Sequence, residues 1–168
     1  MKREAEDYGR LATELEAGYH SIQELFAKNR RATERIEAGA NDELDWAALG
    51  FTLHNIYCAF ENYFLRVSKF FENGLDQRFW HKDLLDRMTL KIPGIRPRLF
   101  SRDYAKRMGE LMRFRHAFRN VYEDELDPRR LRILNGDLPS LVADFGPFHA
   151  GFIAAIDAVA DELGAAPD

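Results

Sequence analysis

Residues 49–71, with the sequence LGFTLHNIYCAFENYFLRVSKFF, decide the fold. Apolar side chains recur along this stretch at steps of three or four residues: Leu49, Leu53, Ile56, Phe60, Phe64, Val67 and Phe71. That spacing is typical of an amphipathic helix, and aromatic neighbours such as Tyr57 and Tyr63 widen its apolar stripe. A helix this apolar belongs at the centre of a bundle, and we predict that it ends near Gly74.

The helical period continues on both sides of this stretch. Residues 8–36 form an amphipathic segment that ends in a turn over residues 39–42. A shorter amphipathic segment over residues 77–90 leads into residues 91–98, where two prolines and a glycine within five residues exclude a helix. The sequence therefore predicts a loop there.

The C-terminal part of the chain carries further helix signals. Ser101 is a predicted N-cap of a helix that reaches about Tyr122. Residues 127–128 start a turn in which the proline suits a first helical position, and a last helix runs from roughly 138 to 163 with a kink or break at 146–147. We predict an all-α fold, an up-and-down bundle of about five helices, with one domain over residues 1–164 and a frayed tail over 165–168.

Length and composition narrow the class of protein. The chain has 168 residues, of which 46% are hydrophobic, enough for a core without covalent staples. A net charge of −4 excludes a globally basic protein that coats nucleic acid. The single cysteine, Cys58, fits a reducing compartment, the charged start is not a signal peptide, and no apolar run approaches the roughly 20 residues that cross a bilayer. We expect a cytoplasmic protein that does not enter a membrane.

One segment has a charge opposite to that of the rest. Residues 91–122 hold nine basic and two acidic side chains, a balance of +7, so the remainder carries −11. Extending the segment to Glu125 lowers the balance to +4. On a helix, Arg115, Arg119 and Tyr122 share one edge, and His116 and Asn120 share the next. The opposite side is predicted to be core, formed by Leu111, Phe114, Ala117, Phe118 and Val121.

Two interpretations of this basic helix remain open. In one, arginines such as Arg113, Arg115 and Arg119 form a solvated face and pair with acidic side chains of a neighbouring helix. In the other, the helix binds phosphate, because arginine forks match phosphate oxygens and an adjacent imidazole transfers protons near neutral pH. Such a pair suits cleavage of RNA through its own 2′-hydroxyl, without a metal.

Several segments together resemble one family. Residues 113–122, RFRHAFRNVY, look like the signature of HEPN-domain proteins, specifically the HepT-like ribonuclease toxins. Residues 53–57 with 61–62, residues 80–85, the proline-rich loop and residues 125–127 resemble that group as well. The resemblance extends over roughly residues 10–163.

The resemblance implies a helical homodimer in which the signature helices of two protomers meet at a shared cleft. It implies a metal-independent endoribonuclease without a cofactor, paired with a nucleotidyltransferase antitoxin that transfers AMP to a tyrosine. Arg115 matches the motif arginine and Tyr122 the AMP acceptor, with Arg113 and Arg119 as further contacts to RNA phosphates.

The motif histidine is replaced in this sequence by Asn120. A carboxamide cannot act as a general acid or base. Either His116, one turn earlier, transfers the proton while Asn120 positions the substrate, or the protein is a catalytically inactive HEPN adaptor that binds a nucleotide or a nucleotidyltransferase.

Other polar residues have simpler interpretations. His54 and Glu61 lie seven apart in the most apolar helix, so they form a buried polar contact or support the Arg115 cleft. We interpret His20 and His149 as structural and Cys58 as a small buried hydrophobe. A di-iron bundle needs Glu-x-x-His on two helices, which the sequence lacks, so no metal site is predicted.

Overall fold

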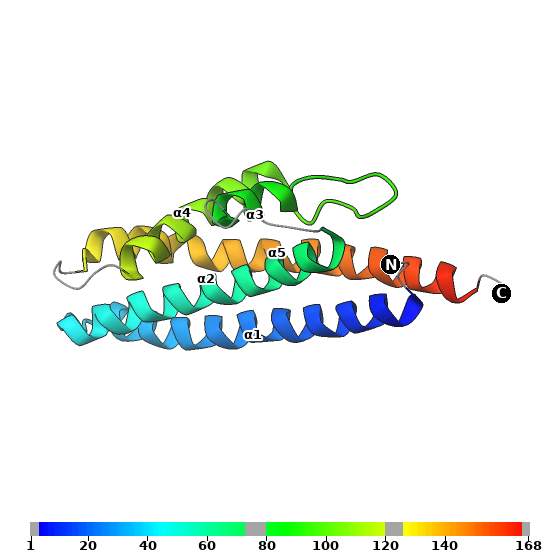
Figure 1. Ribbon diagram of the computed structural model, residues 1–168. Helices are drawn as coiled ribbons and strands as arrows, with labels where there is room; N and C mark the ends of the chain where they lie inside the picture. The colour runs from blue at the N-terminus through cyan, green and yellow to red at the C-terminus, as the bar shows by residue number, and fades with distance from the viewer. Residues whose placement is uncertain (1–3, 73–79, 120–125, 166–168) are drawn as a thin grey trace.

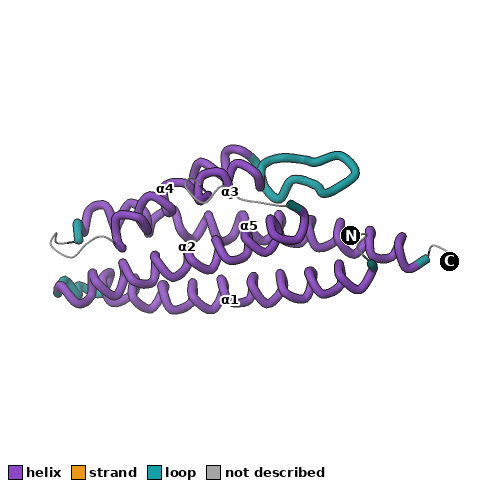
Figure 2. Tube along the Cα trace, viewed as in Figure 1, coloured by secondary structure: helices purple, strands orange, loops and turns teal. Residues whose placement is uncertain are grey.

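The computed structural model describes residues 4–72, 80–119 and 126–165, without the side chains of residues 80–82 and 119. It contains helices α1 (Ala5–Glu37), α2 (Glu43–Phe71), α3 (Trp80–Met88), α4 (Arg102–Arg119) and α5 (Pro128–Gly164). Apart from an isolated bridge between Ile92 and Arg96, these residues form no β-structure (Figure 2). The all-α, five-helix prediction is confirmed.

The long helices α1, α2 and α5 run side by side, and the short helices α3 and α4 lie over them (Figure 1). Helix α1 packs on α2 and α5, whereas α3 and α4 pack on each other and on α2; α4 also contacts α5. Within the described residues α1 has no contact with α3 or α4, so α2 and α5 lie between α1 and the two short helices. Helix α2 is central, as predicted.

Local sequence signals set where helices begin. The Asp42 carboxylate accepts a hydrogen bond from Leu44 N at 2.8 Å and opens α2, just after the turn at Gly39, whose φ is 101°. Ser101 Oγ accepts a hydrogen bond from Tyr104 N at 3.2 Å, which confirms the predicted N-cap of α4. The Asp127 carboxylate accepts from Arg129 N at 2.9 Å and caps α5, with Pro128 in its first turn.

The last helix differs from its prediction. Helix α5 begins at Pro128 rather than near 138, and it continues without a break through Pro139 and Pro147. Each proline removes one backbone hydrogen bond. The helix persists because its flanking apolar side chains are buried in the core, and tertiary packing outweighs local propensity: Leu138, Leu141, Val142, Phe145 and Phe152.

Helix α5 corrects one observation from the sequence, that no apolar run is long enough to cross a bilayer. By length and composition alone it contains a stretch apolar enough to cross a bilayer, with 28% of that window buried. A core helix passes the same test. In this structure α5 contributes to the core together with α1, α2 and α4.

The loop before α4 is fastened by one arginine. Gly94, with φ 72°, turns the chain so that Ile92 N donates to Arg96 O at 3.0 Å. The Arg96 guanidinium is fully buried, contacts the Glu72 carboxylate and donates to the carbonyl oxygens of Arg87, Leu90 and Pro97. This clamp joins the end of α2 to α3 and to the loop.

Candidate functional site

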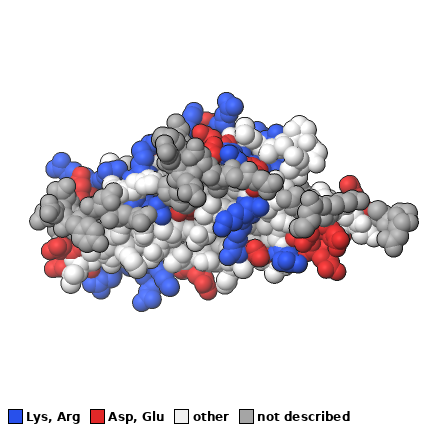
Figure 3. All heavy atoms as spheres, viewed as in Figure 1, with Lys and Arg blue, Asp and Glu red and all other residues white. Residues whose placement is uncertain are grey.

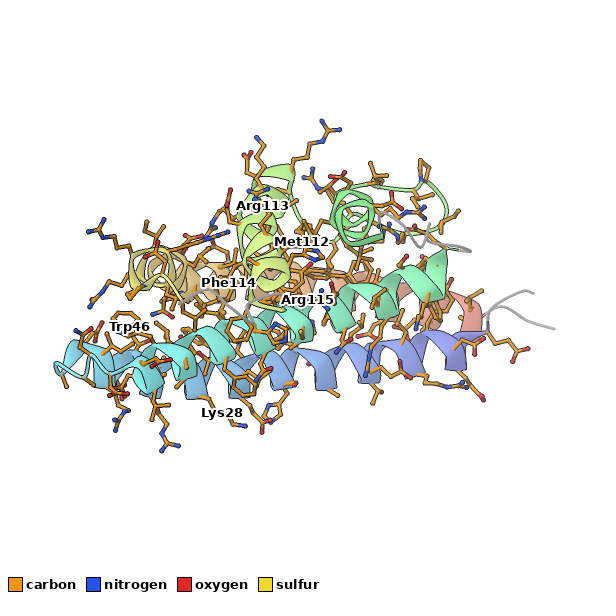
Figure 4. The ribbon with its side chains drawn as sticks, turned by 60° about the vertical axis from the view of Figure 1, so that its left-hand side comes forward. Lys28, Trp46, Met112, Arg113, Phe114 and Arg115 are labelled. Carbon is orange, nitrogen blue, oxygen red and sulfur yellow. The ribbon has the colours of Figure 1, made fainter. Side chains whose placement is uncertain are left out.

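Arg113 and Arg115 of α4 point in different directions. Arg113 points outward and Arg115 points toward α2 (Figure 4). The Arg113 side chain is 57% exposed and contacts Glu110 of the same helix, whereas the Arg115 side chain is 9% exposed. The two guanidinium groups therefore do not form one surface.

The burial of Arg115 corrects the predicted helix face. Arg115 was expected on an open polar edge and Ala117 in the core, but Arg115 is buried and Ala117 is exposed. Arg115 Nη2 lies 3.3 Å from Glu61 Oε2 of α2, whose side chain is 6% exposed. An ion pair lets a guanidinium face the core, because a buried charge is tolerated when a counter-charge meets it.

Tyr57 completes this buried cluster, one helical turn before Glu61. The Arg115 guanidinium carbon lies 5.9 Å from the centre of the Tyr57 ring. Burial, and after it the nearby Glu61 carboxylate, raise the pKa of the Tyr57 hydroxyl well above its usual range, so the phenol stays protonated. We call Tyr57, Glu61 and Arg115 the arginine cluster.

The arginine cluster contains unused hydrogen-bonding capacity. Arg115 Nε, Arg115 Nη1 and the Tyr57 hydroxyl are buried and make no hydrogen bond of good geometry to the described part of the chain. A buried polar group without a partner costs about 1–3 kcal/mol. A ligand that accepted these hydrogen bonds would recover that cost.

His54 of α2 lies beside Phe118, near the C-terminal end of α4. Its ring is 5.3 Å from the Phe118 ring, and its Nε2 is 3.7 Å from Cys58 Sγ, so Cys58 is half-buried next to an imidazole. Gly50 allows this approach, because a Cβ there would lie 3.0 Å from Phe118 Cε2. The structure thus places Glu61 against Arg115, and His54 against Phe118.

The remaining predicted site residues follow Arg115 in the sequence. His116 is exposed, so its side chain does not share the burial of Arg115. The side chain of Arg119, together with Asn120 and Tyr122, lies outside the described residues.

Other basic side chains of the segment have separate surroundings. Arg107 pairs with Asp137 and Asp144 of α5, at 3.1 and 2.6 Å. Of the arginines that the structural interpretation named, Arg115 pairs with a neighbouring helix, whereas Arg113 pairs with Glu110 of its own helix. Arg102, Lys106 and Arg113 border a groove of about 650 Å³ between α3 and α4, which Arg115 does not line. Figure 3 shows Lys and Arg side chains over these two helices.

A second polar group in the core links three helices. Tyr63 of α2 and His149 Nδ1 of α5 are 2.8 Å apart, and His149 Nε2 lies 3.2 Å from Glu16 of α1. The His149 ring stacks on Tyr19 at 4.3 Å. The sequence offered no signal for this contact because its members are distant along the chain. Among the described residues, no group of three or more His, Cys, Asp or Glu side chains is placed to hold a metal ion.

Tyr57 is the residue of the arginine cluster that sequence reasoning did not place near Arg115. It was assigned only to the apolar stripe, since an aromatic residue at helical spacing is indistinguishable from core. Its position four residues before Glu61 was the available signal, because such residues share a helix face.

Comparison with known proteins places the chain in a family. The family model described as HepT-like protein matches residues 48–156, from the first turns of α2 to most of α5. No curated protein and no solved structure matches the chain. The matched range includes most of α2 and all of α3 and α4, and therefore the whole arginine cluster and the described part of the signature. The chain belongs to the HepT-like family of HEPN proteins.

Proposed function

We propose that this protein is a metal-independent endoribonuclease toxin that acts in the cytoplasm as a homodimer. The observation that carries the proposal is the state of Arg115: Glu61 contacts only Nη2 of its guanidinium, and Nε and Nη1 have no hydrogen-bond partner within the described residues. Guanidinium donors that an ion pair holds in place before the substrate arrives are suited to stabilising charge on a transferring phosphoryl group.

The proposed reaction uses the RNA's own 2′-hydroxyl. That oxygen attacks the adjacent phosphorus, the bond to the 5′-oxygen breaks, and a 2′,3′-cyclic phosphate and a 5′-hydroxyl end result. His116 accepts the proton from the 2′-hydroxyl, because it is the imidazole next to the motif arginine, and the leaving 5′-oxygen takes a proton from the protonated His116 or from water. Arg115 holds the scissile phosphate, Asn120 positions the substrate, and Arg113 and Arg119 contact other phosphates.

RNA cleavage tests this proposal directly. The purified protein is incubated with total RNA in the presence of a chelator, and the ends of the fragments are mapped. We expect cleavage that leaves cyclic phosphate ends and that disappears in Arg115→Ala. Equal degradation by the wild type and by Arg115→Ala would identify the activity as a contaminant and refute the proposal.

We further propose that a nucleotidyltransferase antitoxin silences the protein by transferring AMP to Tyr122. Residue 122 follows the motif arginine at the spacing that the family resemblance requires. Co-expression with the nucleotidyltransferase of a neighbouring gene should add one AMP to the wild type and none to Tyr122→Phe, as measured by intact-protein mass spectrometry. AMP on another residue would contradict the assignment.

A catalytically inactive adaptor is the second candidate function. The sequestration of Arg115 by Glu61 favours it, because a buried ion pair is also a purely structural device, and Asn120 removes the motif histidine. Expression in a growth assay separates the two candidates. Growth arrest that His116→Ala relieves would refute the adaptor, whereas unaffected growth together with intact RNA would support it.

A further inference from the structure

The Tyr57 hydroxyl and the Arg115 guanidinium place buried donors close together, and these donors make few hydrogen bonds. Both side chains are buried, and the guanidinium carbon lies 5.9 Å from the Tyr57 ring centre. The guanidinium nitrogens Nε and Nη1 have no hydrogen-bond partner within the described residues, and the Tyr57 hydroxyl makes none of good geometry. The acceptor near that hydroxyl is the Glu61 carboxylate, whose hydrogen bond contributes, after burial, to the raised pKa of Tyr57. Three buried donors without a hydrogen bond of good geometry on two neighbouring side chains are unusual in a protein core, where nearly all polar groups are hydrogen-bonded.

Glu61 accounts for only part of this arrangement. Its carboxylate meets Arg115 Nη2 at 3.3 Å and leaves the rest of the guanidinium without an acceptor. The same carboxylate raises the pKa of Tyr57, after the larger effect of burial, so the hydroxyl keeps its proton and remains a donor. One guanidinium can serve two anions, because its five N–H groups point in different directions within one plane.

We propose that Tyr57 is a phosphate-binding residue, which holds the Arg115 guanidinium with its ring and donates its hydroxyl to the same phosphodiester. The inference rests on the proposed function only in taking a phosphodiester as the anion. Two donor groups from two helices would fix the phosphate between α2 and α4. The donors are buried in this structure, so side chains around Arg115 must move when the phosphate enters.

The chain offers a matched control for this assignment. Tyr63 is another fully buried tyrosine of α2, six residues further on, and its hydroxyl is bonded to His149 rather than directed at Arg115. Tyr57→Phe and Tyr63→Phe therefore make the same chemical change at the same depth in the same helix. Both variants are first compared with the wild type by circular dichroism.

Binding is measured with a single-stranded 2′-deoxyoligonucleotide, which lacks the hydroxyl that cleavage needs. We expect Tyr57→Phe to weaken its binding by about 10-fold or more, the usual range for a lost hydrogen bond to a charged group, and Tyr63→Phe to leave it within about 2-fold. Tyr57→Leu, which also removes the ring, should weaken binding further. Wild-type affinity in Tyr57→Phe, or equal losses in both Phe variants, would overturn the proposal.

A second measurement keeps the two proposals separable. In ¹⁵N-labelled protein, the Nε–H resonance of Arg115, assigned by its absence in Arg115→Ala, should shift when the deoxyoligonucleotide is added. The shift should shrink in Tyr57→Phe and persist in Tyr63→Phe. RNA cleavage together with an Arg115 shift that is the same in Tyr57→Phe as in the wild type would leave the proposed function standing and remove the role of Tyr57. An Arg115 shift that depends on Tyr57, without RNA cleavage, would support the role of Tyr57 in phosphate binding and refute the proposed ribonuclease activity.

Discussion

Arg115 is the residue whose surroundings differ most from a helical-wheel expectation. A helical wheel gives only the angle of each side chain around the helix. Arg115 was assigned to solvent because it shares an edge with other polar residues. The fold buries it instead, because α2 supplies Glu61 at 3.3 Å and the ring of Tyr57 beneath the guanidinium. The type of residue at the site was readable from the sequence, but the side to which it points was not.

Removing Glu61 should leave Arg115 buried without a counter-charge. We expect Glu61→Ala to lower the free energy of unfolding by about 3–5 kcal/mol, the usual cost of breaking a buried ion pair from one side. Glu61→Gln should lose less, because the amide oxygen still accepts a hydrogen bond. Urea unfolding at neutral pH measures both.

Arg113 provides the comparison within the same helix. Its side chain is 57% exposed, so Arg113→Ala should change the free energy of unfolding by no more than about 0.5 kcal/mol. If Glu61→Ala were as mild as Arg113→Ala, the ion pair between Glu61 and Arg115 would not contribute to stability.

At the scale of elements, the clamp between Glu72 and Arg96 joins α2, α3 and the loop before α4. Burial by itself would raise the pKa of Glu72, but hydrogen bonds from Arg96 and Arg87 outweigh it and hold that pKa below its usual value of 4.5. The folded protein therefore binds fewer protons at Glu72 than the unfolded chain does in moderately acidic solution.

This shift gives the clamp a defined pH dependence. Its contribution to stability is fully present above about pH 4.5, the pKa of the unfolded chain, and is lost as the pH falls through the lower pKa of the folded state. Glu72→Gln should therefore be less stable than the wild type at pH 7, and the difference should shrink below about pH 4.5. A difference between the two unfolding free energies that stays constant down to pH 3 would contradict this.

Glycines within helix α5 differ in how much stability a substitution by alanine should add. A Cβ at Gly151 would meet nothing within 4 Å, so Gly151→Ala should raise the free energy of unfolding by about 0.5–1 kcal/mol through helix propensity. A Cβ at Gly146 would lie 3.1 Å from the Tyr19 hydroxyl, so Gly146→Ala should gain less or lose stability. Thermal unfolding of both variants tests the pair, and an equal gain in both would mean that Tyr19 imposes no constraint.

At the scale of the whole molecule, charge is unevenly distributed. Lys and Arg side chains lie over α3 and α4 and also along the side of the molecule formed by α1, and a group of acidic side chains lies near the end where the two termini lie (Figure 3). Basic side chains concentrated in one segment, with −11 on the remainder of the chain, suit contact with a few phosphates rather than broad coating of a polymer.

That distribution predicts a shallow salt dependence for binding of a single-stranded oligonucleotide. With Arg113, Arg115 and Arg119 as contacts, the logarithm of the association constant should fall with the logarithm of salt concentration with a slope of about −2. Fluorescence anisotropy between low and physiological salt measures the slope. A slope several times steeper would indicate an extended basic surface and contradict the proposed site.

The parts of the fold that local chemistry specifies were predicted well. The turn at residues 39–42, the Ser101 cap and the loop at 91–98 follow from glycine, serine and proline acting on their own neighbours. The start and continuity of α5 were predicted wrongly, because burial of distant apolar side chains outweighs the two prolines.

The sequence by itself determined the all-α class, the central position of α2 and the residue types of the site, because periodicity and capping are local properties. Only the tertiary structure decided that Arg115 faces inward, that Glu61 and Tyr57 are its neighbours, and that His149 joins Tyr63 and Glu16. These contacts join residues from different helices. Which partner a side chain meets depends on how the helices pack, and no spacing within one helix encodes that.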